Sequence, residues 1–188
     1  MMKWNIAVIA LLLSACSSQS EVSYYQLPPV AAQSNNAQAV HLSAGKQLWI
    51  ESVTVADFLS GPGIAFQTSD VKYTVAKNNL WGSSLDQQLK QALTDNLSVL
   101  LPGRVVSGQL VSGHDADVLR VTVTGFQGRY DGYAIVSGYW MLQSDNKIIR
   151  RPFNIEAPLQ KDGYDELVYS LANAWHKESV DIANALKN

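Results

Sequence analysis

The side chain best suited to covalent chemistry is that of Cys16, the single cysteine of the chain. It follows Leu13-Ser14-Ala15, at the end of an apolar run that starts at Ile6, shortly after Lys3. The run has eight residues, whereas a helix needs about 20 to cross a bilayer. An export signal typically has a positively charged N-terminus, a short apolar run and small residues before the cleavage point. The thiol of Cys16 directly follows these small residues, at the expected cleavage point.

Leucine, two small residues and cysteine form the pattern of a bacterial lipobox, so we predict that residues 1–15 are a lipoprotein signal peptide. By resemblance to bacterial lipoproteins, Cys16 becomes the first mature residue and carries a diacylglycerol and an N-linked acyl chain such as palmitate, which together anchor stably. The other interpretation is an ordinary secretory signal with an incidental cysteine. Residue 17 is Ser17, not the aspartate typical of inner-membrane retention. We therefore expect the outer membrane, on its periplasmic side.

No other group of residues has the spacing of a reactive site. The segment His114 to Asp117 could be a metal patch, but no other ligands lie at a recognisable spacing, and a solvated turn explains it as well. Gly61-Pro62-Gly63 lacks the following lysine of a phosphate loop, and no G-x-S-x-G elbow is present. We therefore predict no enzyme activity, no catalytic residues, no metal and no cofactor beyond the acyl groups of Cys16.

The charge balance excludes one class of partner. Lysine and arginine number 14 and aspartate and glutamate 16, for a net charge of −2. Nucleic-acid binders usually carry a basic face, so we expect no nucleic acid. Hydrophobic residues make up 47% of the chain, which is typical of a folded domain.

The chain then divides into a tether and one domain. Residues 16–46 are polar and poor in charge and are predicted to be a lipidated tether with a short strand at residues 24–27, stopped by Pro28-Pro29. Residues 47–188 are predicted to be a single periplasmic domain. Strands are expected within residues 48–55, 64–68, 71–76, 104–107, 119–124, 133–142 and 149–156.

Two helices are predicted from apolar residues that recur every three to four positions. One stripe contains Leu85, Leu89, Leu93, Leu97 and Leu100, and the other contains Leu167, Leu171, Trp175, Ile182 and Leu186. Ser84 and Gln87 have the spacing of a capping box before the first helix, and Asp162 is a candidate cap for the second. Strands with short turns and two such helices predict an α+β two-layer sandwich, a mostly antiparallel sheet with both helices on one face.

The strand at residues 133–142 is apolar on both alternations, so both of its faces should be covered. Two helices cover only one face of the sheet, and Tyr139, Trp140 and Met141 are therefore candidates for an interface. Which of them points outward is not fixed by the sequence. Lys147 with Arg150-Arg151 is a small basic cluster that could meet lipid headgroups or an acidic partner, or form a solvated strand end.

The order of the motifs resembles a known family. A lipobox precedes Tyr24-Tyr25-Gln26-Leu27, then come the strand LWIESVTV at residues 48–55 and Asn78-Asn79-Leu80-Trp81 before the leucine helix. This resembles the ABC-type transport auxiliary lipoprotein family. The family has no catalytic motif, and only Cys16 transfers as a functional position.

The resemblance implies a part in lipid transport between the inner and outer membranes that supports envelope integrity. The lipoprotein would dock a periplasm-spanning assembly to outer-membrane lipid, beside an MCE-domain partner of the paraquat-inducible, PqiB-like type. Identical copies of the chain could cover the sheet face that the helices leave exposed, so we also predict a symmetric homo-oligomer. The alternative is a stand-alone periplasmic lipoprotein that binds a lipid or a peptide, which would need a cavity. A lipoprotein that touches the cell wall is a third class.

Overall fold

The computed structural model describes residues 21–29, 46–111 and 115–187. Cys16, the signal peptide, most of the tether and His114 lie outside the described residues. The elements are β1 (Ser23–Tyr25), β2 (Gln47–Val55), the 3-10 turn η2 (Asp57–Leu59), β3 (Gly63–Ser69), β4 (Lys72–Trp81), α2 (Leu85–Leu100), β5 (Val106–Ser107), β6 (Ala116–Arg129), β7 (Tyr133–Ser144), β8 (Lys147–Pro158) and α3 (Tyr164–Lys187).

The long strand β6 is the centre of an eight-stranded sheet. Strands β7 and β8 follow it on one side as antiparallel neighbours. On the other side β2 pairs in parallel with the first half of β6, and β3 pairs in parallel with its last two residues. Strands β5, β4 and β1 extend the sheet from there. The predicted α+β fold is confirmed, with a sheet that is mixed because β2 and β3 reach β6 through crossovers.

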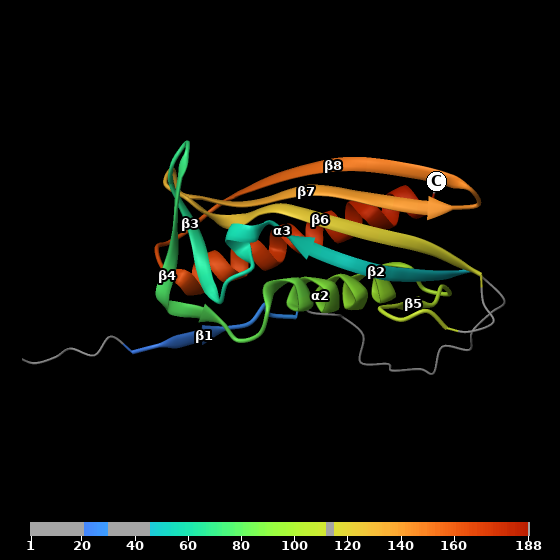
Figure 1. Cartoon of the computed structure of the whole chain (residues 1–188), viewed down its shortest axis with the longest axis horizontal. Coiled ribbons are helices and arrows are strands. Elements are labelled where there is room, and N and C mark those ends of the chain that lie inside the picture. The colour runs from blue at the N-terminus through green and yellow to red at the C-terminus, as the bar shows by residue number, and fades with distance from the viewer. Residues whose placement is uncertain (1–20, 30–45, 112–114, 188) are drawn as a thin grey trace, which may run out of the picture.

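Both helices pack against the same side of the sheet and against each other (Figure 1). The predicted stripes form the core, since Leu89, Leu93 and Leu97 of α2 are fully buried with Leu171 and Trp175 of α3. The indole Nε1 of Trp175 donates a 3.1 Å hydrogen bond to the carbonyl of Leu89 and so ties the two helices together. No helix in the described part of the chain is long and apolar enough to cross a membrane.

The helix starts differ from the prediction. Ser84 is the N-cap of α2, but its side chain makes no capping hydrogen bond, so the predicted capping box is wrong. Asp162 lies two residues before Tyr164, the first residue of α3, because Gly163 comes between them with φ of +115°. A positive φ is open to glycine at little cost, and the turn it makes separates Asp162 from the helix end.

The short strand predicted at residues 24–27 forms at Ser23–Tyr25, with Gln26 and Leu27 outside it, and joins the sheet. It pairs in parallel with β4, with Ser23 opposite Asn79 and Tyr25 opposite Trp81. The Gly82 amide extends the pairing by donating to the carbonyl of Tyr25 over 2.7 Å. The chain is thus fixed to the domain at Ser23–Tyr25.

Candidate functional site

The predicted interface residues divide between the two faces of β7. Alternate side chains of a strand point to opposite faces. Trp140 is 3% exposed and belongs to the core beneath the helices. Tyr139 and Met141 are half-buried on the opposite face, which neither helix covers. Trp140 is therefore a core residue, and the interface prediction continues for Tyr139 and Met141, which share the open face of the sheet.

Tyr139 is held flat on this open face by Arg150 of β8. The guanidinium carbon of Arg150 lies 3.9 Å from the centre of the Tyr139 ring, a cation–π contact. Register explains the contact, because Arg150 is directly opposite Met141 and so diagonal to Tyr139. A tyrosine and an arginine fixed against each other give a rigid amphipathic surface, of the composition that is enriched where protein interfaces are most buried.

Met141 lies between two arginines, of which one has a carboxylate partner and the other has none among the described residues. Its cross-strand partner on β6 is Arg120, whose side chain forms an ion pair with Glu51 of β2. Its neighbour across β8 is Arg150, for which no carboxylate partner is found among the described residues. The open face therefore combines Tyr139, Met141 and one uncompensated positive charge. This arrangement suits an acidic or aromatic partner surface, and it contains no nucleophile paired with a base.

The other predicted positive residues do not form one cluster. Arg151 lies opposite Trp140 on the helix side, with its guanidinium carbon 5.8 Å from the indole centre. Arg150 lies on the open face, so strand alternation separates the two arginines. A single binding site made of Lys147, Arg150 and Arg151 is therefore wrong. All three residues are exposed near the start of β8, as expected of the alternative, a solvated strand end.

On the helix side, Trp140 meets a buried carboxyl group. Its indole Nε1 donates a 3.0 Å hydrogen bond to Oε1 of Glu178 on α3. Glu178 is 3% exposed, and burial, with a smaller effect of nearby Asp181, raises the pKa of its carboxyl to about 7 even though the indole hydrogen bond lowers it. The sequence showed Glu178 only as a polar position on an amphipathic helix, and gave no sign that it is buried.

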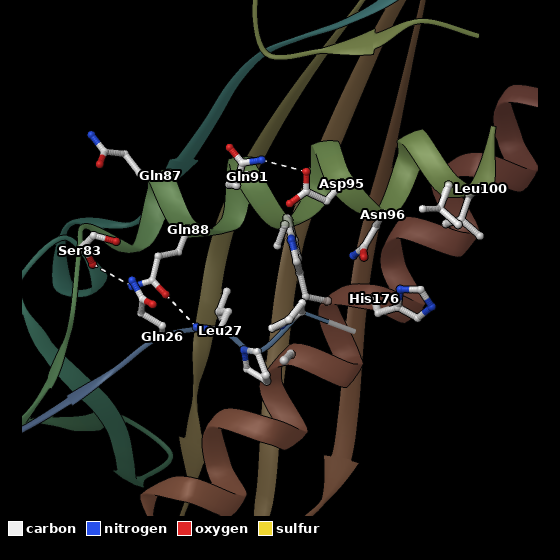
Figure 2. Close-up of a pocket in the computed structure, with 16 residues that line it drawn as sticks. Gln26, Leu27, Ser83, Gln87, Gln88, Gln91, Asp95, Asn96, Leu100 and His176 are labelled. Atoms are coloured by element: carbon white, nitrogen blue, oxygen red, sulfur yellow. Dashed lines mark hydrogen bonds between the residues drawn. The ribbon is translucent and has the colours of Figure 1, made fainter. Parts of the chain in front are cut away.

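A groove of about 910 Å³ runs along the outer side of the helix layer. Figure 2 shows it between residues 26–29, α2 and α3, with the amide side chains of Gln87, Gln88 and Gln91 along one wall. Leu27, Val99 and Leu100 add apolar surface. The groove borders the core at Trp175, and its lining holds five side-chain amides and one carboxylate, that of Asp95.

Gln88 joins the tether segment to the groove. Its side-chain oxygen accepts the Leu27 amide over 2.9 Å, and its side-chain nitrogen donates to the carbonyl of Ser83 over 3.0 Å (Figure 2). Gln88 therefore holds residues 26–29 against α2. The sequence showed the glutamines of this helix but not which of them has a partner, because that partner lies 61 positions earlier.

One residue of the segment that could have been a metal patch is engaged in ion pairs. Asp117 is 7% exposed and forms an ion pair with Arg104, and Lys46 lies 3.9 Å away from it. Asp117 is therefore a buried residue at the start of β6, whereas Asp115 is exposed, as expected of a solvated turn. Across residues 21–29, 46–111 and 115–187, no three histidine, cysteine, aspartate or glutamate side chains come together as a metal site.

Comparison with known proteins gives one family. The model of the ABC-type transport auxiliary lipoprotein component matches residues 25–183. Two relatives called intermembrane transport lipoprotein PqiC, from Escherichia coli strain K12 and from Shigella flexneri, are each 48% identical over 188 residues. Each alignment covers 100% of this chain and 98% of the relative. These relatives are transport lipoproteins and not enzymes.

Solved structures agree on the fold. A crystal structure of an uncharacterized protein has a TM-score of 0.77 and 49% identity, and the match covers 88% of this chain and 99% of that one. A Xanthomonas campestris protein has a TM-score of 0.69 at 15% identity, with 88% of this chain and 94% of that chain covered. The second match concerns the fold alone.

Proposed function

Because this chain belongs to the ABC-type transport auxiliary lipoprotein family, we propose that it is the outer-membrane lipoprotein of an MCE-type intermembrane lipid transport system. The observation that carries the proposal is 48% identity along the full chain to proteins called intermembrane transport lipoproteins. In this role it docks a periplasm-spanning assembly to the outer membrane and supports envelope integrity.

The anchor is Cys16. Cleavage after Ala15 leaves Cys16 as the mature N-terminus, acylated and inserted in the periplasmic leaflet of the outer membrane. The lipobox and Ser17 support this position. The docked domain begins at Ser23, where β1 joins the sheet.

The partner is an MCE-domain protein of the PqiB-like type, and the docking surface is the open face around Tyr139, Met141 and Arg150. These residues are fixed by strand register and are left uncovered by both helices, and Arg150 has no carboxylate partner in the described part of the chain. A closed ring of identical copies is the arrangement that best suits a lipoprotein around a transport assembly, since homo-oligomers usually close by symmetry.

Co-purification from detergent-solubilised envelopes tests this role. The full-length tagged protein should retain an MCE-domain protein, and Tyr139→Asp should lose it. Tyr169→Asp, which changes an exposed tyrosine on α3, is the matched control and should retain the partner. The proposal would be contradicted if the wild-type chain retained no MCE-domain protein.

A second candidate function is suggested by the groove of about 910 Å³, which is large enough for a small ligand. A free lipid or peptide bound there would make the chain a stand-alone binding module. The amide-rich wall of α2 suits a peptide better than an acyl chain, since buried amides without partners are costly. Native mass spectrometry of the purified protein distinguishes the two roles. Only a stand-alone binding module should retain a bound ligand once it has been separated from any partner protein.

A further inference from the structure

One end of the domain gathers exposed apolar side chains. Val71 lies at the tip of the β3–β4 hairpin, Tyr73 and Val75 follow on β4, and Tyr130 and Tyr133 flank the β6–β7 turn. We call these five residues the hairpin end. They are adjacent because β3 pairs with the last residues of β6 and because the Tyr130 hydroxyl donates to Asp70 over 2.5 Å.

Contacts within the domain account for part of the hairpin end, since the Tyr73 ring packs on Phe58 and Arg129 lies over the Tyr133 ring. They do not account for Val71. Val71 is 91% exposed, at a turn position where glycine, asparagine or aspartate is the usual choice. Four of the five exposed tyrosines in the described part of the chain lie here or on β1, namely Tyr24, Tyr73, Tyr130 and Tyr133. Tyrosine combines an apolar ring with a polar tip and is favoured at the boundary between lipid headgroups and water.

The tether leaves the domain near this end. Strand β1 is parallel to β4, so the chain before Ser23 leads toward the end of β4 that carries the hairpin tip. Figure 1 shows β1 and the β3–β4 hairpin at the same end of the molecule, opposite the β7–β8 turn. Cys16 is six residues before Val22, which allows a reach of about 21 Å.

That reach decides which end can meet the membrane. Strand β7 has 12 residues and spans roughly 40 Å, from the hairpin end at Tyr133 to the opposite turn. An acylated Cys16 thus holds the hairpin end close to the bilayer and leaves the β7–β8 turn beyond its reach.

The charges of the hairpin end do not oppose such a contact. Asp70 accepts the Tyr130 hydroxyl, and Arg129 is paired with both Asp131 and Glu156 at 2.8 Å. The carboxylates are thus each engaged by a donor within the domain. Contact with lipid there depends on apolar and aromatic surface rather than on net charge.

We propose that the hairpin end lies on the phospholipid surface, with Val71, Tyr73 and Tyr130 at the headgroup boundary. This inference rests on acylation of Cys16 in the proposed function. It assigns a second membrane contact, which fixes the orientation of the domain so that the opposite end points into the periplasm.

The test uses the full-length acylated protein in vesicles of phosphatidylethanolamine and phosphatidylglycerol. The sulfur of acylated Cys16 is a thioether, so Val71→Cys supplies the one free thiol for an environment-sensitive fluorophore. The matched control is Ile148→Cys at the opposite end, where Ile148 is 70% exposed. We expect a blue shift and loss of iodide quenching for the probe at position 71, and neither change at position 148.

The outcomes separate the inference from the proposed anchor. In one outcome the protein floats with the vesicles, but iodide quenches the probe at position 71 as strongly as the probe at position 148. This result would overturn the membrane contact and leave the anchor intact. Protein that does not float contradicts acylation and removes the inference with it. Shielding that appears only when an MCE-domain protein is added assigns the hairpin end to a protein contact and overturns the lipid surface.

Discussion

The indole Nε1 of Trp140 and the carboxyl Oε1 of Glu178 are joined by a 3.0 Å hydrogen bond inside the core. The pair connects the middle of β7 to α3, so that the strand with the open outer face is fixed from its inner side. Burial raises the pKa of this carboxyl to about 7. The folded domain therefore binds a proton here at pH values where an unfolded glutamate has released it.

We predict that the domain loses stability as pH rises from about 4.5 through about 7. In this window the folded state holds a proton that the unfolded state lacks, so the free energy of unfolding falls. With the pKa raised from 4.5 to about 7, the full loss is roughly 3 kcal/mol. Glu178→Gln should remove this dependence and raise the melting temperature at pH 8, since the amide oxygen still accepts the indole proton. Exposed Asp162→Asn is the matched control, and an unchanged pH profile in Glu178→Gln would contradict the assignment.

Cys16→Ala is expected to release the protein from membranes without unfolding the domain, because the described core is built from Tyr25 and residues that follow it. Membrane fractionation and circular dichroism measure the two effects. The intact mass of the wild-type protein purified from membranes should lack residues 1–15 and include the acyl groups. A soluble wild-type chain with an unmodified N-terminus would refute the lipobox interpretation.

Leu93→Asp should cost several kcal/mol, because Leu93 is fully buried between α2 and the sheet and a carboxylate there has no partner. Thermal unfolding measures the loss. Leu110→Asp, at an exposed leucine, makes the same chemical change and should leave the melting temperature nearly unchanged. Equal melting temperatures for the two variants would remove the core assignment of α2.

Tyr139 and Trp140 should respond oppositely to substitution. Trp140→Ala empties a core position and leaves Glu178 without its donor, at a cost of about 3–5 kcal/mol. Tyr139→Asp loses the stack with Arg150 on the open face and should leave the melting temperature close to that of the wild type while it weakens self-association or partner capture. Analytical ultracentrifugation and melting curves distinguish the two effects. Assembly unaffected by Tyr139→Asp would place the interface elsewhere.

Gln88→Ala should free the tether segment from α2. The Leu27 amide then has no acceptor on the helix, a loss of about 1 kcal/mol, and the amides of Tyr25 and Leu27 should exchange hydrogen faster. Gln87→Ala lies on the same helix without that bond and is the control. Equal protection in both variants would show that β1 is held by its pairing with β4 alone.

The elements that depend on local order could be predicted from the sequence. The leucines of α2 at every third or fourth position form one helix stripe, whatever the helix packs against, because helix periodicity is set within the segment itself. The strand expected at residues 119–124 is found within β6 for the same reason, since Leu119, Val121 and Val123 alternate with polar residues. The turn before Tyr133 is also a local feature, because Asp131-Gly132 suits a tight turn and Gly132 has φ of +86°. The lipobox is likewise a contiguous pattern.

The orientation of β7 was decided only by the tertiary structure. Tyr139 and Trp140 are neighbours of similar character, and both alternations of their strand are apolar. Which of them is core depends on the side of the sheet on which α3 docks, and Glu178, 38 positions away, meets Trp140 there. Arg150 and Arg151 separate for the same reason, and the parallel pairing of β1 with β4 and of β2 with β6 brings together segments that no local pattern links. Helix and strand periods are short-range properties of the chain, whereas packing against a particular face comes from burial of surface shared by distant segments.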